Sequence, residues 1–236
     1  MAQRTKQTAA RGRRAPASSG NGRAGRAGRR AGRRAGGGET GRQAEVLALA
    51  GDLFARNGYA ATTVRDIAEA AGILSGSLYH HFASKEAMVD EILRSFLDEI
   101  LGVYDEILDA GLEPRATFEA LANVSLAAME RHQAAIVIYQ NDGRLLSGLP
   151  AFSYLRTAGQ RFERAWVTVL EEGIDSGDFR SSVDPELAYR FVRATLWTVA
   201  RWYRPGGDLT PQEISSQYLS IMLDGISKAK KKKTRT

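Results

Sequence analysis

The chain has 236 residues, 43% of them hydrophobic, which is enough to bury the core of one domain or of two small ones. It contains no cysteine, which excludes disulfide bonds and thiolate metal sites. No run reaches the roughly 18 consecutive apolar residues of a membrane-spanning helix, and the first residues lack the apolar core of a signal peptide, so we expect a cytoplasmic protein without a membrane partner.

The positive charge is concentrated at the two ends of the chain. The formal net charge is +6, but eleven of the 33 Lys and Arg side chains lie in residues 1–36 and six in residues 228–236. The intervening residues 37–227 hold the other 16 and all 27 acids, which gives them a net charge of −11. Sequence-specific binding to a nucleic acid would therefore have to rest on a local patch.

Residues 1–38 consist mainly of Arg, Gly and Ala. Because such a composition buries too little apolar surface to offset the entropy of ordering, we expect a disordered basic tail, matched by a shorter one at 228–236. Such tails are most simply solvated, and the alternative is that they add non-specific attraction to phosphates.

A helical pattern begins at Glu39, with apolar side chains at three- and four-residue steps as far as Phe54, and Asn57-Gly58 is typical of a helix end. Thr63 and Asp66 have the spacing of a capping box, which predicts the start of a second helix.

Gly72 predicts a turn and residues 75–81 a third helix. Two short helices joined by a glycine turn are typical of the helix-turn-helix, whose second helix lies in the major groove of DNA. Leu78 and Phe82 can pack inward, whereas the small and polar side chains can face bases and phosphates. The residues expected to contact DNA are Thr63, Arg65, Ser75, Gly76, Ser77, Tyr79, His80 and Lys85.

Ser84 is placed to cap a long fourth helix, and five more helical blocks follow at about 114–131, 133–146, 151–175, 184–203 and 211–227, bounded mostly by prolines. There is no convincing alternating strand and no internal repeat. The sequence therefore predicts an all-α fold with a helix-turn-helix domain at 39–98 and a larger helical domain at 99–227.

The segment TTVRDIAEAAGILSGSLYHHFASKEAMV, residues 62–89, closely resembles the N-terminal signature of the TetR family of regulators. It departs from the family pattern at Leu74-Ser75, where many members carry a Ser followed by Lys or another polar residue, and this leaves the operator sequence open. The resemblance implies a homodimer in which the last two helices of each copy form a four-helix bundle, and a larger domain whose small-molecule ligand releases DNA.

Within the family, residues 72–86, 137–140 and 201–207 are similar to the actinobacterial repressors of late, ring-degrading cholesterol catabolism. This similarity implies an effector that is a coenzyme A (CoA) thioester of a steroid-ring fragment. A TetR-like repressor of another acyl-CoA, fatty-acid or efflux system is the alternative.

The block at 184–203 and the residue that follows it carry Arg190, Arg193, Trp197, Arg201 and Arg204 at helical spacing, opposite an apolar stripe of Val192, Leu196, Val199 and Tyr203. Cations beside a tryptophan suit phosphates and an adenine or an apolar ring system. We predict an effector site there, formed by Arg190, Arg193, Trp197 and Arg201 with Tyr139 as a weaker contact. The alternative is a solvated face paired with acids such as Glu171, Glu172 and Asp175.

An enzyme is the main alternative from another class, and the sequence argues against it. His80 and His81 are adjacent, so on a helix they diverge by about 100° and cannot hold one metal together. No nucleophile elbow, phosphate loop or metal-ligand spacing is present, so we expect no catalytic residue, no metal and no cofactor. A non-specific architectural nucleic-acid-binding protein, which would bind through the tails, is the remaining possibility.

Overall fold

The computed structural model describes residues 36–226, with side chains for residues 41–225, and this part is all-helical, without β-strands. The predicted tails at 1–38 and 228–236 lie almost wholly outside the described residues. The helices are α1 (Gly36–Asn57), α2 (Val64–Ala70), α3 (Ser75–His81), α4 (Lys85–Asp109), α5 (Pro114–Ala127), α6 (Met129–Leu146), α7 (Tyr154–Ser176), α8 (Pro185–Trp202) and α9 (Pro211–Ile226), with the 3-10 turn η1 (Pro150–Phe152). None of them is long and apolar enough to cross a membrane.

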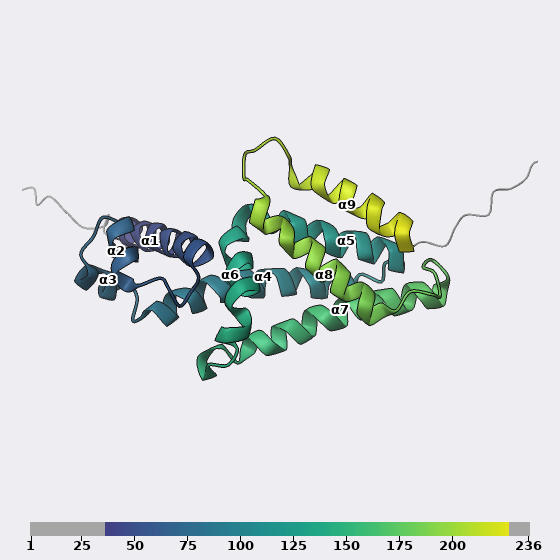
Figure 1. Cartoon of the computed structure of the whole chain (residues 1–236), viewed down its shortest axis with the longest axis horizontal. Coiled ribbons are helices and arrows are strands. Elements are labelled where there is room, and N and C mark those ends of the chain that lie inside the picture. The colour runs from purple at the N-terminus through teal and green to yellow at the C-terminus, as the bar shows by residue number, and fades with distance from the viewer. Residues whose placement is uncertain (1–35, 227–236) are drawn as a thin grey trace, which may run out of the picture.

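Helices α1, α2 and α3 form an N-terminal unit at one end of the molecule (Figure 1). Local signals set its turns: Gly58 ends α1 with φ 84°, and Gly72 joins α2 to α3 with φ 65°. The predicted capping box of α2 is present, since the Asp66 amide donates to Thr63 Oγ1 and the Thr63 amide to Asp66 Oδ2. Both glycines and the cap were predicted.

The N-terminal unit has an apolar centre, in which Phe54, Ile67, Leu78 and Phe82 are buried, and this centre is continuous with the core of the body. Leu78 and Phe82 were predicted to point inward from α3, and both do. The start of α4 extends this centre, because Met88 is buried beside it. The first turns of α4 therefore belong structurally to the N-terminal unit.

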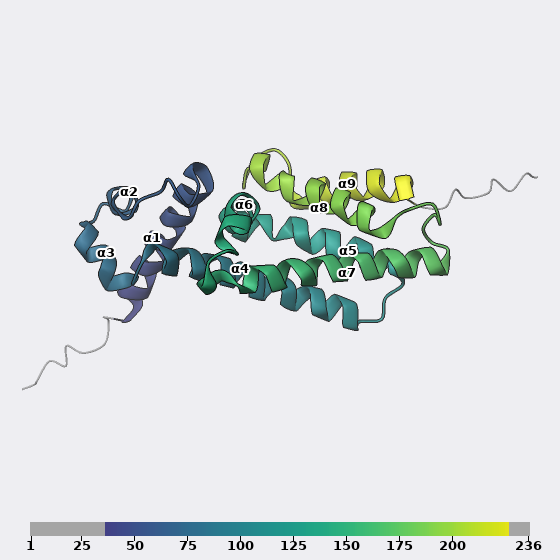
Figure 2. The ribbon, with the colours of Figure 1, turned by 60° about the horizontal axis from the view of Figure 1, so that its bottom comes forward.

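Helices α5 to α9 form the body, and α4 leads into it from the N-terminal unit (Figures 1 and 2). The central helix α5 packs against α4, α7, α8 and α9. In the core, the Tyr104 hydroxyl lies 2.6 Å from Ser125 Oγ and accepts a hydrogen bond of 3.2 Å from Trp166 Nε1. The domain boundary predicted at residue 98 falls inside α4, which both parts share.

Two helix boundaries differ from the predicted ones. The break predicted at residue 132 is a kink, where His132 has φ −121° within α6, and the chain leaves helix α5 earlier, at Ala128. Helix α8 ends at Trp202, so Arg204 lies beyond it and does not continue the predicted arginine face.

Candidate nucleic-acid interface and ligand pocket

The outer face of α3 presents most of the residues predicted to contact DNA. Ser75, Gly76, Tyr79 and His80 are exposed, and Tyr79 is 57% exposed although it is aromatic. Ser77 is half-buried. Small residues with a protruding aromatic and an imidazole suit close approach to a groove and contact with base edges.

Leu74, immediately before α3, is an additional candidate on this face. Its side chain is 79% exposed, the largest value among the exposed bulky apolar residues of the described part. An apolar side chain at this position suits contact with a thymine methyl group. In the sequence, Leu74 stood out only as a departure from the family pattern.

The other predicted DNA contacts flank α3 and are partly engaged within the protein. Thr63 is exposed, and the hydrogen bond from its backbone amide is the main cause that holds the pKa of Asp66 below the ordinary value. Arg65 is exposed and forms an ion pair of 2.8 Å with Glu69. Lys85 Nζ donates to the carbonyl oxygens of Tyr59 and Thr62, so two of its three N–H groups are already used. Its contact with phosphate remains a prediction.

On α8, the two faces are separated largely as predicted. Val192, Leu196, Val199 and the following Tyr203 are buried and form the core side. Arg190 and Arg193 are exposed on the other side and form no hydrogen bond or ion pair with any described residue. The predicted alternative of pairing with Glu171, Glu172 or Asp175 is therefore absent from the described structure.

Arg190 and Arg193 line a pocket of about 220 Å³ between α6 and α8, called the α8 pocket. Its other lining residues are Tyr139, Gln140, Ala194, Trp197 and Thr198. Burial raises the pKa of the Tyr139 hydroxyl, and the positive charge of Arg193 opposes this shift. Four of the five predicted effector residues thus meet at one pocket.

Trp197 lies beneath the arginine face rather than on it, which corrects its predicted position. It is 7% exposed and packs with its ring centroid 5.7 Å from that of Phe96 and 5.5 Å from that of Phe162, both edge to face. Tyr139 lies 6.4 Å away on the same centroid measure. The indole therefore forms the floor of the α8 pocket and part of the body core at once.

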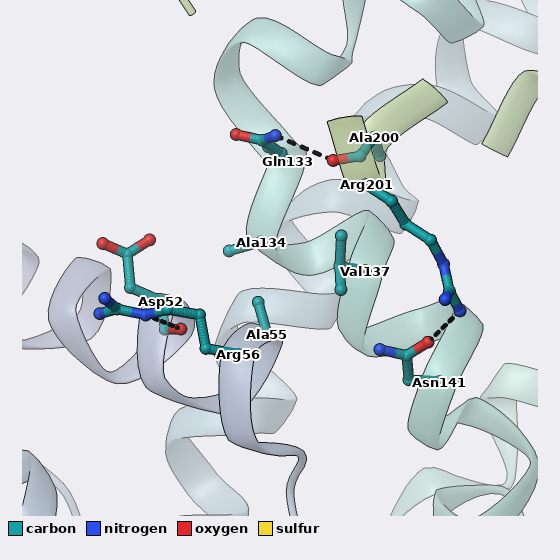
Figure 3. A pocket seen from close by; sticks show the side chains of 9 residues that line it. All are labelled: Asp52, Ala55, Arg56, Gln133, Ala134, Val137, Asn141, Ala200 and Arg201. Atoms are coloured by element: carbon teal, nitrogen blue, oxygen red, sulfur yellow. Dashed lines mark hydrogen bonds between the residues drawn. The ribbon is translucent and has the colours of Figure 1, made fainter. Parts of the chain in front are cut away.

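Arg201, the fifth predicted effector residue, lines a different pocket. This seam pocket, of about 480 Å³, lies where α1 meets α6 and α8, and is lined by Asp52, Ala55, Arg56, Gln133, Ala134, Val137, Asn141, Ala200 and Arg201. Arg201 Nη2 donates to Asn141 Oδ1 over 2.5 Å, and Figure 3 shows it across the pocket from Asp52 and Arg56. Arg201 therefore belongs to the seam pocket and does not extend the α8 pocket.

Sequence reasoning missed a polar turn on α6 that contacts both α8 and the N-terminal unit. Gln140 donates to the Trp197 carbonyl and accepts from Arg201. Asp142 Oδ2 accepts a hydrogen bond of 3.0 Å from the backbone amide of Tyr59. No sequence signal links Tyr59 with Asp142, because they lie 83 positions apart.

No group of three or more His, Asp or Glu side chains within the described residues is placed to hold a metal ion. His132 Nε2 lies 2.8 Å from Glu99 Oε2 and so belongs to a contact between α6 and α4. His80 and His81 lie on α3 of the N-terminal unit.

Comparison with family models assigns both parts of the chain. Residues 46–92 match the model "Bacterial regulatory proteins, tetR family", and residues 111–226 match "Tetracyclin repressor-like, C-terminal domain". The first match runs from within α1 through α2 and α3 to the start of α4, and the second covers α5 to α9.

Named relatives agree with both matches. The chain is 53% identical over 190 residues to the HTH-type transcriptional repressor KstR2 of Rhodococcus jostii, which covers 80% of this chain and 93% of that protein. The structure of the ketosteroid transcriptional regulator KstR2 of Mycobacterium tuberculosis superposes with a TM-score of 0.75 at 51% identity, covering 79% of this chain and 95% of that one. At 20% identity, AibR in complex with isovaleryl coenzyme A and operator DNA shares the fold with a TM-score of 0.64, over 76% and 97% of the two chains.

Proposed function

Since the chain belongs to the TetR family and is a DNA-binding transcriptional repressor rather than an enzyme, we propose that it represses genes of steroid-ring catabolism and is released from its operator by a CoA thioester of a steroid-ring fragment. A repressor acts beside the bacterial chromosome, so its place of action is the cytoplasm.

The observation that carries the effector proposal is the pair of guanidinium groups at the mouth of the α8 pocket. Arg190 and Arg193 have no carboxylate partner among the described residues, so their charge is available to phosphate oxygens. Tyr139 and Trp197 supply an aromatic wall and floor for an apolar or planar group. A ligand with phosphates at one end and a ring system at the other matches both features.

The volume of the α8 pocket indicates how such a ligand would lie. At about 220 Å³ it is smaller than the ~300–1,000 Å³ typical of sites that enclose a drug-sized ligand. One end of the thioester would enter the pocket, and its phosphates would remain at the arginines. The named relatives support a steroid-derived effector, because those at about 50% identity are KstR2 repressors, one of them described as a ketosteroid regulator.

Exposed apolar side chains on the last two helices support a homodimer. Leu187, Phe191 and Trp202 are exposed on α8, and Ile221 is exposed on α9. Such a surface is costly in water and is typical of a contact between subunits. Two copies would place two α3 helices for two half-sites of an operator.

Ligand binding can be tested by thermal unfolding of the purified protein with acetyl-CoA, isovaleryl-CoA, octanoyl-CoA and a CoA thioester of a steroid-ring fragment. We expect the steroid-derived thioester to raise the melting temperature most and to release operator DNA. Arg193→Met should abolish both effects while DNA binding persists. The matched control is Arg180→Met, which removes an exposed arginine outside the α8 pocket. A shift with octanoyl-CoA alone would instead indicate a fatty-acid regulator.

A second variant tests the floor of the same pocket. Trp197→Leu removes an aromatic surface that the ring system would contact, so we expect weaker release of DNA by the steroid thioester. Because Trp197 also packs in the core, far-UV circular dichroism and operator binding must first show that this variant is folded. Normal release in both Trp197→Leu and Arg193→Met would refute the effector site.

The DNA-binding surface can be tested by gel shift. Tyr79→Ala should remove sequence preference, because Tyr79 protrudes from the outer face of α3. Deletion of residues 1–35 should leave that preference in place. If the deletion alone abolished specific binding, DNA would be recognised by the N-terminal tail rather than by α3.

A further inference from the structure

One hydrogen bond joins the N-terminal unit to the body in the described structure. The backbone amide of Tyr59, in the loop between α1 and α2, donates to Asp142 Oδ2 on α6 over 3.0 Å. Between residues 41–82 and residues 116–225, the described part of the chain has no other hydrogen bond. Helix α4 provides the covalent connection, so this bond is a second and separate link.

Around this bond, α1 packs closely on α6, and pockets open beside the contact. Gly51 lies against Ala134, where an added Cβ would come within 3.4 Å of the alanine Cβ. The seam pocket opens on one side of this contact, and a pocket of about 470 Å³ that includes Gly51 and Ile92 lies between α1, α4 and α6. The small residues let α1 and α6 approach closely, so a movement of α6 would be passed on to α1.

On the loop side, Tyr59 is tied to the elements that carry the DNA-binding face. Its carbonyl oxygen and that of Thr62 accept hydrogen bonds from Lys85 Nζ, and its hydroxyl donates to Glu86 Oε1 over 2.6 Å. Thr62 directly precedes Thr63, the N-cap of α2. A displacement of Tyr59 would therefore reach the start of α2 and of α4 together.

On the body side, the turn of α6 that carries Asp142 also lines the α8 pocket. Tyr139 and Gln140 belong to the lining, and Asn141 holds Arg201 at the edge of the seam pocket. These residues are consecutive with Asp142 on one rigid helix. A ligand that shifts the backbone of this turn would move Asp142 with it.

We propose that Asp142 is the positioning residue that transmits occupancy of the α8 pocket to the helix-turn-helix, through its bond to the Tyr59 amide. This inference rests on the proposed function for the nature of the effector, but not for the link itself. A ligand shifts the equilibrium between a DNA-binding and a released state only by binding the two states with different affinity. Through its bond to Asp142, Tyr59 would occupy a different position in each state.

The link can be tested without any effector by amide hydrogen exchange. The probe is a DNA duplex that the wild-type protein selects from a random pool. Because coupling between two sites is reciprocal, DNA binding should slow exchange in residues 136–141 of the wild type. Asp142→Ala should lose this protection while retaining protection of α3. The proposal would be overturned if DNA did not protect residues 136–141 in the wild type, or if it protected them equally well in Asp142→Ala.

Two variants separate the link from general damage. Asp142→Asn keeps an acceptor oxygen in the same position and should restore most of the protection. Tyr59→Phe removes the hydroxyl bond to Glu86 but keeps the backbone amide that Asp142 binds, so it should behave as wild type in this assay. Equal loss in Asp142→Asn and Asp142→Ala, or loss in Tyr59→Phe, would mean that the turn is only a structural support.

The effector arm uses the four CoA thioesters of the thermal-unfolding experiment. Where one of them weakens DNA binding by the wild type, within the roughly 5- to 150-fold usual for allosteric coupling, Asp142→Ala should bind the thioester with similar affinity yet release DNA little. If no thioester releases the wild type while the exchange result holds, the effector proposal fails and the link stands.

Discussion

Tyr59, in the loop between α1 and α2, forms hydrogen bonds to three different residues through its amide, its carbonyl oxygen and its hydroxyl. Its amide binds Asp142, its carbonyl oxygen accepts from Lys85, and its hydroxyl donates to Glu86. The Lys85 ammonium also lies 4.2 Å from the centroid of the tyrosine ring. Position 59 therefore links the body, the loop and the start of α4, and Tyr59→Phe removes the hydroxyl contact while it keeps both backbone contacts.

The hydroxyl of Tyr59 should control the titration of Glu86. Its hydrogen bond is the largest cause that holds the pKa of Glu86 below the ordinary value of about 4.3. A carboxyl group with a lowered folded-state pKa stabilises the fold above the ordinary value, and this contribution is lost as the pH falls through the lowered value. Tyr59→Phe should therefore raise the Glu86 pKa and lower the free energy of unfolding at neutral pH more than in acid.

Carboxyl ¹³C NMR titration measures this change directly, and urea unfolding at several pH values measures its effect on stability. Asp142→Asn is the matched control, because it alters the amide contact of Tyr59 and leaves the hydroxyl in place. A Glu86 pKa that stayed the same in Tyr59→Phe would contradict the assignment of the hydroxyl bond as the main cause.

Whether a side chain is buried or exposed was predictable where it depends on the helical period alone. The inward positions of Leu78 and Phe82 follow from that period, as does the exposure of Tyr79. Trp197 was misplaced because it lies at the border between the two faces of α8, and its large indole turns under the arginines to reach Phe96 and Phe162. The bond between Tyr59 and Asp142 depends on tertiary packing alone, which periodicity does not encode.

At the scale of elements, the end of α7 depends on a glycine that touches an aromatic ring. A Cβ added at Gly173 would lie 2.2 Å from Phe179 Cδ2, and the Phe179 ring is itself buried against Phe118. Because neither ring has room to move, Gly173→Ala should lower the free energy of unfolding by about 1–3 kcal/mol or more. Urea unfolding followed by circular dichroism is the measurement.

Gly102→Ala provides the control for this substitution. Gly102 lies within α4, is exposed, and has no atom within 4 Å of an added Cβ. Alanine there should raise stability by about 0.5–1 kcal/mol, since glycine is the poorer helix former. If both variants changed stability in the same direction and by the same amount, helix propensity rather than the Phe179 contact would explain the result.

The elements themselves were largely predictable, because their ends carry local signals. Thr63, Ser84 and Asp184 each accept a capping hydrogen bond at a helix start. The junction of α5 and α6 was the exception. Helix α5 ends before Ala128, which is neither proline nor glycine and forms no side-chain capping hydrogen bond. The kink at His132 coincides with the contact of His132 with Glu99 on α4. Packing, rather than a local signal, sets that boundary.

At the scale of the whole molecule, the exposed apolar face of α8 should decide the oligomeric state. Phe191 is 59% exposed, and burial of such a ring between two copies would stabilise a dimer. Phe191→Asp would place a charge in that interface, so we expect a monomer by analytical ultracentrifugation and much weaker operator binding. Leu112→Asp is the control, because Leu112 is also exposed but belongs to the loop before α5 rather than to α8 or α9. A dimer that persisted in Phe191→Asp would exclude this face as the interface.

The distribution of charge over the whole chain separates attraction from recognition. Residues 37–227 carry a net charge of −11, whereas the two basic ends hold 17 Lys and Arg side chains and no acid. Cationic tails contribute sequence-independent attraction to phosphates, whose dependence on salt grows by about 0.9 in logarithmic slope for each phosphate contacted. A protein restricted to residues 36–226 should therefore bind all DNA more weakly and with a shallower salt dependence, yet keep its preference for the selected duplex. Fluorescence anisotropy over a series of salt concentrations, with selected and random duplexes, measures both quantities. Suppose that the protein without its tails lost its preference for the selected duplex and yet bound DNA with the same salt dependence as the full chain. Sequence recognition would then lie outside α3.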